Sequence, residues 1–159
     1  MTVAKPHKQA GIGDAHMTTH LPQVGVGVVV LNVYNEVLLI RRGEEPNKGL
    51  WTIPGGRQEP GEALAQTAHR EILEETNVTI SDPVLIDVVD LIRHDPHGNL
   101  IRHYTLVDYA ARYADGTPKP GGDADAIQWV PARDIEAFVE WSETVRIVQE
   151  AVRKLTAKD

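Results

Sequence analysis

The feature that most constrains this chain is the segment from Gly56 to Val78, which reads GRQEPGEALAQTAHREILEETNV. Its part from Ala63 to Thr76 contains no Gly or Pro, and Ala, Leu, Gln and Glu dominate it. This composition predicts a helix. Asn tolerates the left-handed backbone conformation that closes a helix, so we expect the helix to stop at Asn77.

The helical spacing of this segment predicts that acidic side chains point inward. At about 100° per residue, one apolar stripe predicted to face the core contains Leu64, Ala65, Ala68 and Ile72. Glu71 and Glu75 fall on the edge of that stripe or inside it, whereas Glu74 lies about one residue-step further round. A carboxylate turned towards a core is costly unless a cation or strong hydrogen-bond donors compensate it.

Two interpretations of this acidic helix are open from the residues alone. The three glutamates could form a solvated acidic face, partly paired with Arg70 and His69, as charge runs usually do. Alternatively, clustered oxygen ligands with few soft donors nearby suit Mg²⁺ or Mn²⁺, which a few carboxylates hold while substrate phosphates complete the shell. The inward placement of two carboxylates favours the second interpretation.

These residues resemble the signature of the Nudix hydrolases, G-x5-E-x7-R-E-U-x-E-E-x-G-U, in which U is an aliphatic residue. Gly56 is followed after five residues by Glu62 and after seven more by REILEETNV, residues 70–78. Asn77 stands where the signature has Gly, and Asn also tolerates the left-handed conformation. The preceding LWTIPGG, residues 50–56, resembles the strand and loop that lead into this signature. The resemblance implies an α/β fold, the Nudix α/β/α sandwich with a mixed β-sheet between helices.

The resemblance also implies roles for individual residues. It gives the Gly55 carbonyl, Glu71, Glu74 and Glu75 as candidate metal ligands, and Glu62, Arg70, Glu74 and Glu75 as candidate catalytic residues. In this assignment Glu71 and Glu75 are the principal ligands, and Glu74 is a further ligand or the base for the attacking water. Arg70 would orient the neighbouring carboxylates, and Glu62 would pair with Arg70 if the loop folds back.

Two further pairs of charged residues are candidates for the same site. Family members often supply one more acid from a loop before a late strand, and here that acid is Asp123 or Asp125, with Asp123 matching the spacing better. Both could instead be plain loop acids. Arg41 and Arg42 end a predicted strand beside a polar loop, where they are either rim charges or contacts to a substrate phosphate.

The other predicted elements are mostly strands. We expect strands at residues 24–31, 37–42, 50–54 and 127–130, a long hairpin of 84–92 and 100–113 around a turn at 95–99, a short helix at 134–137 capped by Asp134, and a final helix at 143–155.

Length and composition limit the remaining possibilities. The chain has 159 residues, of which 42% are hydrophobic, and this fits one globular domain at residues 23–157 preceded by a flexible extension at 1–22. The formal charge of −7 argues against binding a nucleic-acid polymer. There is no cysteine, which agrees with a cytoplasmic location. No apolar run has the length of a membrane span.

The expected activity is metal-dependent cleavage of the pyrophosphate bond in a nucleoside diphosphate linked to another moiety. ADP-ribose or a nucleoside diphosphate sugar is the first candidate among small-molecule nucleotide substrates, and nucleoside triphosphates, ordinary or oxidised, are the alternative. A reading of another class is a non-catalytic nucleotide-sensing domain. A lost glutamate of the signature would favour that reading, and none is lost. Relatives commonly pair as dimers, which leaves a homodimer open.

Overall fold

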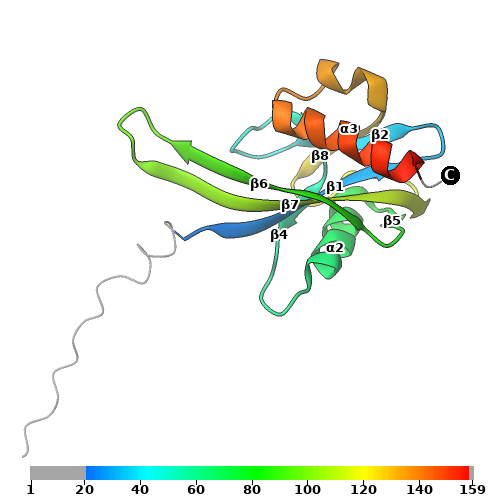
Figure 1. Cartoon of the computed structure of the whole chain (residues 1–159), viewed down its shortest axis with the longest axis horizontal. Helices are drawn as coiled ribbons and strands as arrows, with labels where there is room; N and C mark the ends of the chain where they lie inside the picture. The colour runs from blue at the N-terminus through cyan, green and yellow to red at the C-terminus, as the bar shows by residue number, and fades with distance from the viewer. Residues whose placement is uncertain (1–20, 158–159) are drawn as a thin grey trace, which may run out of the picture.

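The computed structural model describes residues 21–157, so the predicted extension at 1–22 lies outside it except for its last two residues. A mixed β-sheet forms the centre, and helices cover both of its faces (Figure 1). The predicted α/β class is therefore confirmed. Among the described residues, none of the helices is both long and apolar enough to cross a bilayer.

Within residues 21–157, eight strands and three helical segments make up this arrangement. The strands are β1 (Gln23–Leu31), β2 (Glu36–Arg42), β3 (Trp51–Thr52), β4 (Gly55–Arg57), β5 (Thr79–Ile80), β6 (Val84–His94), β7 (Leu100–Asp115) and β8 (Ala124–Pro131). The helices are α2 (Leu64–Thr76), the 3-10 helix η1 (Ala132–Ala137) and α3 (Ser142–Thr156).

The position of β1 in the sheet explains how the glycine loop reaches the centre of the molecule. On one side β1 pairs with β7 in parallel along its whole length. On the other side β1 meets β2 near Leu31 and pairs with β4 at residues 25–27. The two strands β1 and β2 therefore diverge, and the segment that carries β3 and β4 lies between them. This places Gly55 and Gly56 against the middle of the sheet.

Successive side chains along each strand point to opposite faces of the sheet, and this produces two cores, one on each face. The core beneath α2 contains Val26, Val28, Val30, Leu38, Ala68, Ile72, Val78, Ile80 and Ala111. The core beneath α3 and η1 contains Val29, Leu31, Val37, Leu39, Val89, Ala110, Val130, Ile135, Val139, Ile147, Val148 and Ala151. Each helix is held by its apolar stripe, and the polar side of α2 is left to face the glycine loop.

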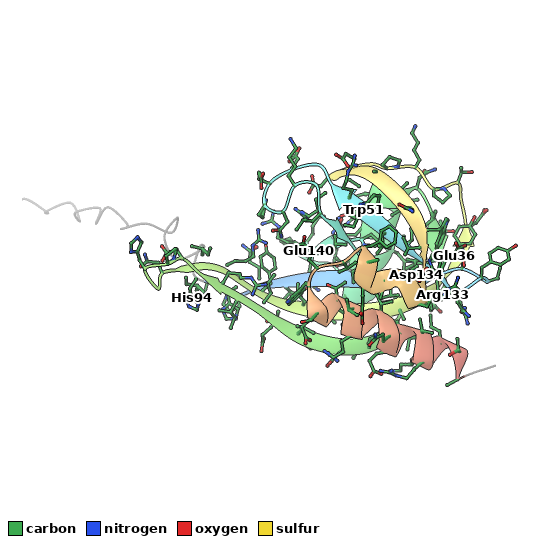
Figure 2. All side chains as sticks on the ribbon, turned by 90° about the horizontal axis from the view of Figure 1, so that it is seen from above. Glu36, Trp51, His94, Arg133, Asp134 and Glu140 are labelled. Atoms are coloured by element: carbon green, nitrogen blue, oxygen red, sulfur yellow. The ribbon has the colours of Figure 1, made fainter. Side chains whose placement is uncertain are left out.

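Some details differ from the sequence prediction. Residue 131 precedes η1 as its capping position, and Asp134 lies within its first turn without capping it, so that prediction was wrong. Ala65, predicted to face the core, is exposed, because only the Ala68 and Ile72 side of α2 meets the sheet. The short strands β4 and β5 were not predicted. The β6–β7 hairpin projects well beyond the helices, with His94 near its far end (Figure 2).

Candidate functional site

Helix α2 carries two of its glutamates inward, as its spacing predicts. Ala68 and Ile72 anchor it to the sheet, and Asn77 closes it with a φ of 59°, in the left-handed conformation expected there. This anchoring turns Glu71 and Glu75 towards the loop at Gly55 and Gly56, whereas Glu74 lies on the exposed side.

Glu75 is buried, with only 6% of the residue exposed. Its Oε2 lies 3.5 Å from the amide nitrogen of Gly55. Burial, followed by the negative charge of Glu71, raises the pKa of Glu75 to about 8. A carboxyl group with this pKa lacks a cation close enough to stabilise its charged form.

Glu71 lies against Gly56, where the absence of a side chain makes room for it. A Cβ atom at residue 56 would come within 2.3 Å of the Glu71 carboxylate, so any other residue would displace this glutamate. Burial raises the pKa of Glu71, and a hydrogen bond from Arg70 partly offsets that effect. Glu71, which is partly buried, and Glu75, which is buried, are therefore facing carboxyl groups that repel each other when both are ionised.

Arg70 connects the start of the helix to these carboxylates. Its guanidinium donates through Nε and Nη2 to the two oxygens of Glu62, the second at 3.0 Å. Its Nη1 donates to Glu71 at 2.8 Å and to Glu74 at 3.2 Å. The loop thus folds back, as the predicted pairing required. The hydrogen bonds from Arg70 are the main reason that the pKa of Glu62 is lowered to about 2.

The arrangement suits a divalent cation at Glu71 and Glu75. Within residues 21–157 no three acidic or histidine side chains converge as a ready metal-binding set. The Glu74 side chain is 54% exposed and turns to Arg70. Mg²⁺ is commonly bound by one or two carboxylates while water and substrate phosphates supply its other ligands, and Glu71 and Glu75 offer such a pair. The residues present therefore fit such a cation.

A loop that the sequence analysis did not connect with this helix binds its C-terminal end. The amide of Gly121 donates to the Glu75 carbonyl at 3.0 Å, and that of Lys119 donates to the Thr76 carbonyl at 2.9 Å. These bonds satisfy carbonyls that a helix end leaves without partners. A Cβ at residue 121 would lie 2.4 Å from the Glu74 carbonyl oxygen. The Gly121-Gly122 pair was the available signal for such a close approach.

The same loop separates the two candidate loop acids. The charge of Asp123 contributes to the raised pKa of Glu75, so Asp123 lies on the side of the glutamates. Asp125 instead accepts a hydrogen bond from Nε of Arg41 at 2.7 Å. The backbone carbonyl of Asp123 also accepts the amide of Gly43 at 2.8 Å, which links this loop to the end of β2.

The two predicted substrate-binding arginines are placed differently. Arg41 is engaged with Asp125, and its guanidinium lies 5.9 Å from the ring centre of Trp51. Arg42 donates through Nε to the Pro46 carbonyl at 2.9 Å. Its charge lowers the pKa of Glu75, so Arg42 is the arginine of this pair that acts on the acidic site.

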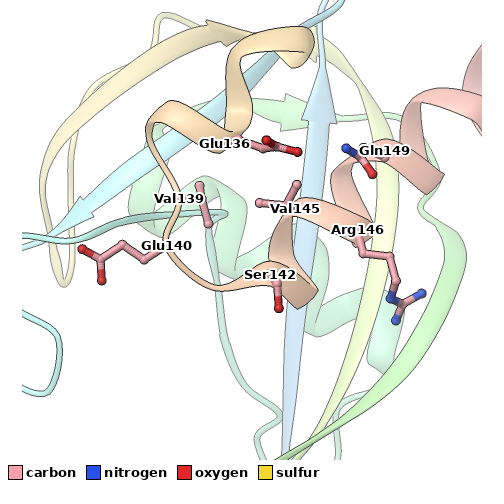
Figure 3. Close-up of a pocket in the computed structure, with 7 residues that line it drawn as sticks. All are labelled: Glu136, Val139, Glu140, Ser142, Val145, Arg146 and Gln149. Carbon is pink, nitrogen blue, oxygen red and sulfur yellow. The ribbon is translucent and has the colours of Figure 1, made fainter.

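A hollow of about 390 Å³ lies elsewhere, beside η1 and the first turns of α3 (Figure 3). It is lined by Glu136, Val139, Glu140, Ser142, Val145, Arg146 and Gln149. None of these residues belongs to the acidic site. The Arg146 guanidinium points away from Glu136 and Val139 in this view and is paired with Asp87 and Glu143.

The mixed α/β fold and the glutamate-bearing helix define a hydrolase of the Nudix type, and comparison with known proteins agrees. Residues 21–150 match the family model described as NUDIX domain, and the chain therefore belongs to the Nudix hydrolase family. Members of this family generally need divalent metal ions, and its enzymes act on small nucleotides.

Two relatives illustrate the similarity in sequence. The "Putative 8-oxo-dGTP diphosphatase" of Bacillus subtilis (strain 168) is 32% identical over 115 residues, which cover 72% of this chain and 70% of that protein. The ADP-ribose pyrophosphatase of Methanocaldococcus jannaschii is 36% identical over 90 residues, which cover 57% of this chain and 51% of that protein. The chain thus spans about half of the archaeal relative.

Two solved structures illustrate the similarity in fold. The MutT NUDIX hydrolase from Burkholderia pseudomallei has a TM-score of 0.68 and 26% identity, covering 82% of this chain and 98% of its own. The NUDIX domain of Shewanella oneidensis NrtR, complexed with ADP ribose, has a TM-score of 0.72 and 22% identity, covering 87% of this chain and 92% of its own. The second similarity supports the fold alone.

Proposed function

We propose that this chain hydrolyses the phosphoanhydride bond of a nucleoside diphosphate linked to another moiety, with Mg²⁺ or Mn²⁺ as its cofactor. The observation that carries the proposal is the pair of Glu71, which is partly buried, and Glu75, which is buried, against the glycine loop. Two acidic side chains at this depth are costly unless a cation joins them. A pyrophosphate is a suitable substrate because it needs the same positive charge.

In this proposal each residue of the site has a separate task. Glu71, Glu75 and the Gly55 carbonyl hold the cation, and Glu74 is a further ligand or accepts a proton from the attacking water. A divalent cation bound there would neutralise charge on the diphosphate and favour attack of water at phosphorus. Arg70, held by Glu62, fixes the orientation of the neighbouring carboxylates without touching the substrate.

Asp123 is the better candidate for the additional acid, because its charge acts on Glu75 whereas Asp125 is paired with Arg41. Arg42 is the better candidate for contact with a substrate phosphate. Its charge also acts on Glu75, and its hydrogen bond to Pro46 fixes only the Nε of a five-donor guanidinium.

The first candidate substrate remains ADP-ribose or a nucleoside diphosphate sugar, and the name of the archaeal relative supports it. The name of the bacterial relative supports the alternative, a nucleoside triphosphate whose base is oxidised guanine. Both substrates present a pyrophosphate to the same glutamates, so the acidic site does not separate them. The choice depends on groups that contact the base.

The test is a Mg²⁺-dependent hydrolysis screen over ADP-ribose, nucleoside diphosphate sugars, nucleoside triphosphates and 8-oxo-dGTP, in which the nucleoside monophosphate product is separated and measured by chromatography. We expect turnover of at least one substrate and a loss of several orders of magnitude in Glu75→Gln. The control is Glu136→Gln, which neutralises an exposed acid of η1 and should leave turnover unchanged. Equal turnover of Glu75→Gln and the unsubstituted protein at saturating Mg²⁺ would refute the proposal. Nucleotide binding without any turnover would favour a nucleotide-sensing domain.

A further inference from the structure

Asp108 is a buried carboxylate that the proposed hydrolysis does not use. It lies in β7 on the face of the sheet that α3 covers, and only 6% of it is exposed. Within residues 21–157 its carboxylate forms no hydrogen bond or ion pair. Because no fully buried side-chain oxygen there lacks a partner, the Asp108 oxygens must still reach solvent. Within the described residues, the capacity of this carboxylate to accept hydrogen bonds is therefore unused.

No cationic side chain among the described residues forms an ion pair with Asp108. Arg146 of α3 is the neighbouring cation, but its Nη2 donates to Asp87 and to Glu143, each at 2.9 Å. Burial, followed by the charge of Asp87, raises the pKa of Asp108 to about 6. At neutral pH the group is still mainly ionised, so a buried anion is kept here without a donor. Such costly groups are often retained for function.

Glycines of β1 create the space that Asp108 occupies. A Cβ at Gly27 would lie 2.3 Å from Oδ1 of Asp108 and 3.0 Å from Cδ1 of Ile53. The acid therefore rests directly over the backbone of β1, with an aliphatic side chain beside it. A larger residue at position 27 would push the carboxylate away.

Apolar side chains continue the same surface towards the hairpin. A Cβ at Gly25 would lie 2.9 Å from Leu106 and 3.4 Å from the ring of Tyr104, so these side chains lean over β1 next to Asp108. Leu106, Tyr104 and Ile53 are all only partly buried. A flat apolar ring could contact them while its edge meets the carboxylate.

This surface lies a short distance from the acidic site but on the other face of β1, because Asp108 is on the face that α3 covers, whereas Glu71 and Glu75 approach the glycine loop from α2. Gly27 pairs with Gly55 across β1 and β4, and the Gly55 amide faces Glu75. Asp108 is on the next strand, beside Gly27. Two strand spacings of about 4.8 Å place Asp108 roughly 10 Å from Gly55. A nucleoside joins its phosphate to the edge of its base over a span of the same order.

We propose that Asp108 binds the base of the nucleotide whose diphosphate lies at Glu71 and Glu75, and that it selects guanine-type bases. An ionised carboxylate only accepts hydrogen bonds. Guanine presents two adjacent donors, N1–H and its exocyclic amino group, which can meet the two oxygens together. Adenine presents one donor beside an acceptor. This inference rests on the proposed function and, within it, favours a guanine nucleotide over ADP-ribose.

The test is calorimetric binding of GMP, IMP and AMP in the presence of Mg²⁺. IMP keeps N1–H but lacks the amino group, so it removes one of the two hydrogen bonds. We expect GMP to bind the unsubstituted protein at least about tenfold more tightly than AMP, with IMP between them, since a good bidentate contact discriminates by that much. In Asp108→Asn, one acceptor is replaced by a donor, and the preference for GMP should disappear.

The matched control is Asp90→Asn, which removes an exposed carboxylate of the neighbouring strand β6 that does not act on Asp108 and should keep the preference for GMP. The inference is overturned if AMP binds the unsubstituted protein as tightly as GMP, or if Asp108→Asn weakens both nucleotides by the same factor. The first comparison requires no variant, so it decides even if Asp108→Asn does not fold.

Hydrolysis separates failure of this inference from failure of the proposed function. Equal kcat/KM for GDP-linked and ADP-linked substrates, with Glu75→Gln inactive on both, would refute base selection by Asp108 and leave the hydrolase intact. Full activity of Glu75→Gln would instead refute the proposed function.

Discussion

Glu62 and Arg70 are eight residues apart, yet both carboxylate oxygens of Glu62 accept hydrogen bonds from the Arg70 guanidinium. The same guanidinium reaches Glu71, so the loop before α2 is connected to the buried carboxylates through one side chain. Thr67 and the amide of Glu59 also donate to Glu62, each at 2.9 Å. Because all of these partners are fixed, Glu71 has little freedom to leave Gly56.

Arg70→Lys should weaken metal binding while the fold is retained. A lysine keeps the charge but lacks the planar fork that serves Glu62 and Glu71 together. Loss of such a supporting contact typically costs about 10–100-fold in metal affinity. Calorimetric titration with Mn²⁺ measures the change. Arg57→Lys is the control, since only the backbone carbonyl of Arg57 meets Arg70. Unchanged Mn²⁺ affinity in Arg70→Lys would show that this connection is dispensable.

The sequence predicted the parts of the site that depend on local periodicity. Helical spacing is enough to turn Glu71 and Glu75 inward, and Asn77 was recognised as the helix end because of its backbone preference. The position of Asp108 follows instead from the parallel pairing of β1 with β7, two strands separated by most of the chain. A residue-by-residue reading contains no signal for such a register. The contact of Gly121 with α2 also joins distant segments, and the Gly121-Gly122 pair was its only signal in the sequence.

Gly121→Ala should disturb the acidic site although residue 121 bears no functional group. The added Cβ would lie 2.4 Å from the Glu74 carbonyl oxygen, so the loop or the end of α2 must shift. Overpacking of this kind destabilises by about 1–3 kcal/mol. We expect lower stability in urea together with weaker Mn²⁺ binding. Thr117→Ala, at an exposed position of the same loop, should change neither quantity. A loss of stability without any loss of Mn²⁺ affinity would limit Gly121 to a structural role.

Asp123→Asn should lower activity more than Asp125→Asn. Asp123 acts on Glu75 through its charge, whereas Asp125 forms a partly exposed ion pair with Arg41. Exposed ion pairs contribute about 0–1 kcal/mol to stability, so loss of the Asp125 charge should have little effect. The measurement is the Mg²⁺ concentration that gives half-maximal turnover in each variant. The reverse order of effects would assign the additional acid to Asp125.

Asp108→Asn should stabilise the protein at alkaline pH and lose this advantage in acid. The folded-state pKa of Asp108 is raised from 3.8 to about 6, so the folded state binds the proton more tightly than the unfolded state. Stability from this group is therefore present below pH 3.8 and is lost as the pH rises through about 6. Two pKa units correspond to about 3 kcal/mol, which is the most that the substitution could recover at pH 8.

Urea unfolding of Asp108→Asn and of the unsubstituted protein at pH 4.5, 6 and 8 checks this expectation, because their difference isolates Asp108 from the other titrating groups. Asp87→Asn should change stability with pH in the opposite direction. The amide of Val88 and the Arg146 side chain lower the pKa of Asp87, so its removal should destabilise at pH 8 and matter less in acid. If Asp108→Asn differed from the unsubstituted protein equally at all three pH values, Asp108 would not be a buried anion at neutral pH. The hydrogen-bond donors of a bound guanine would then have no buried anion to stabilise, and the proposed selectivity for guanine would lose its physical cause.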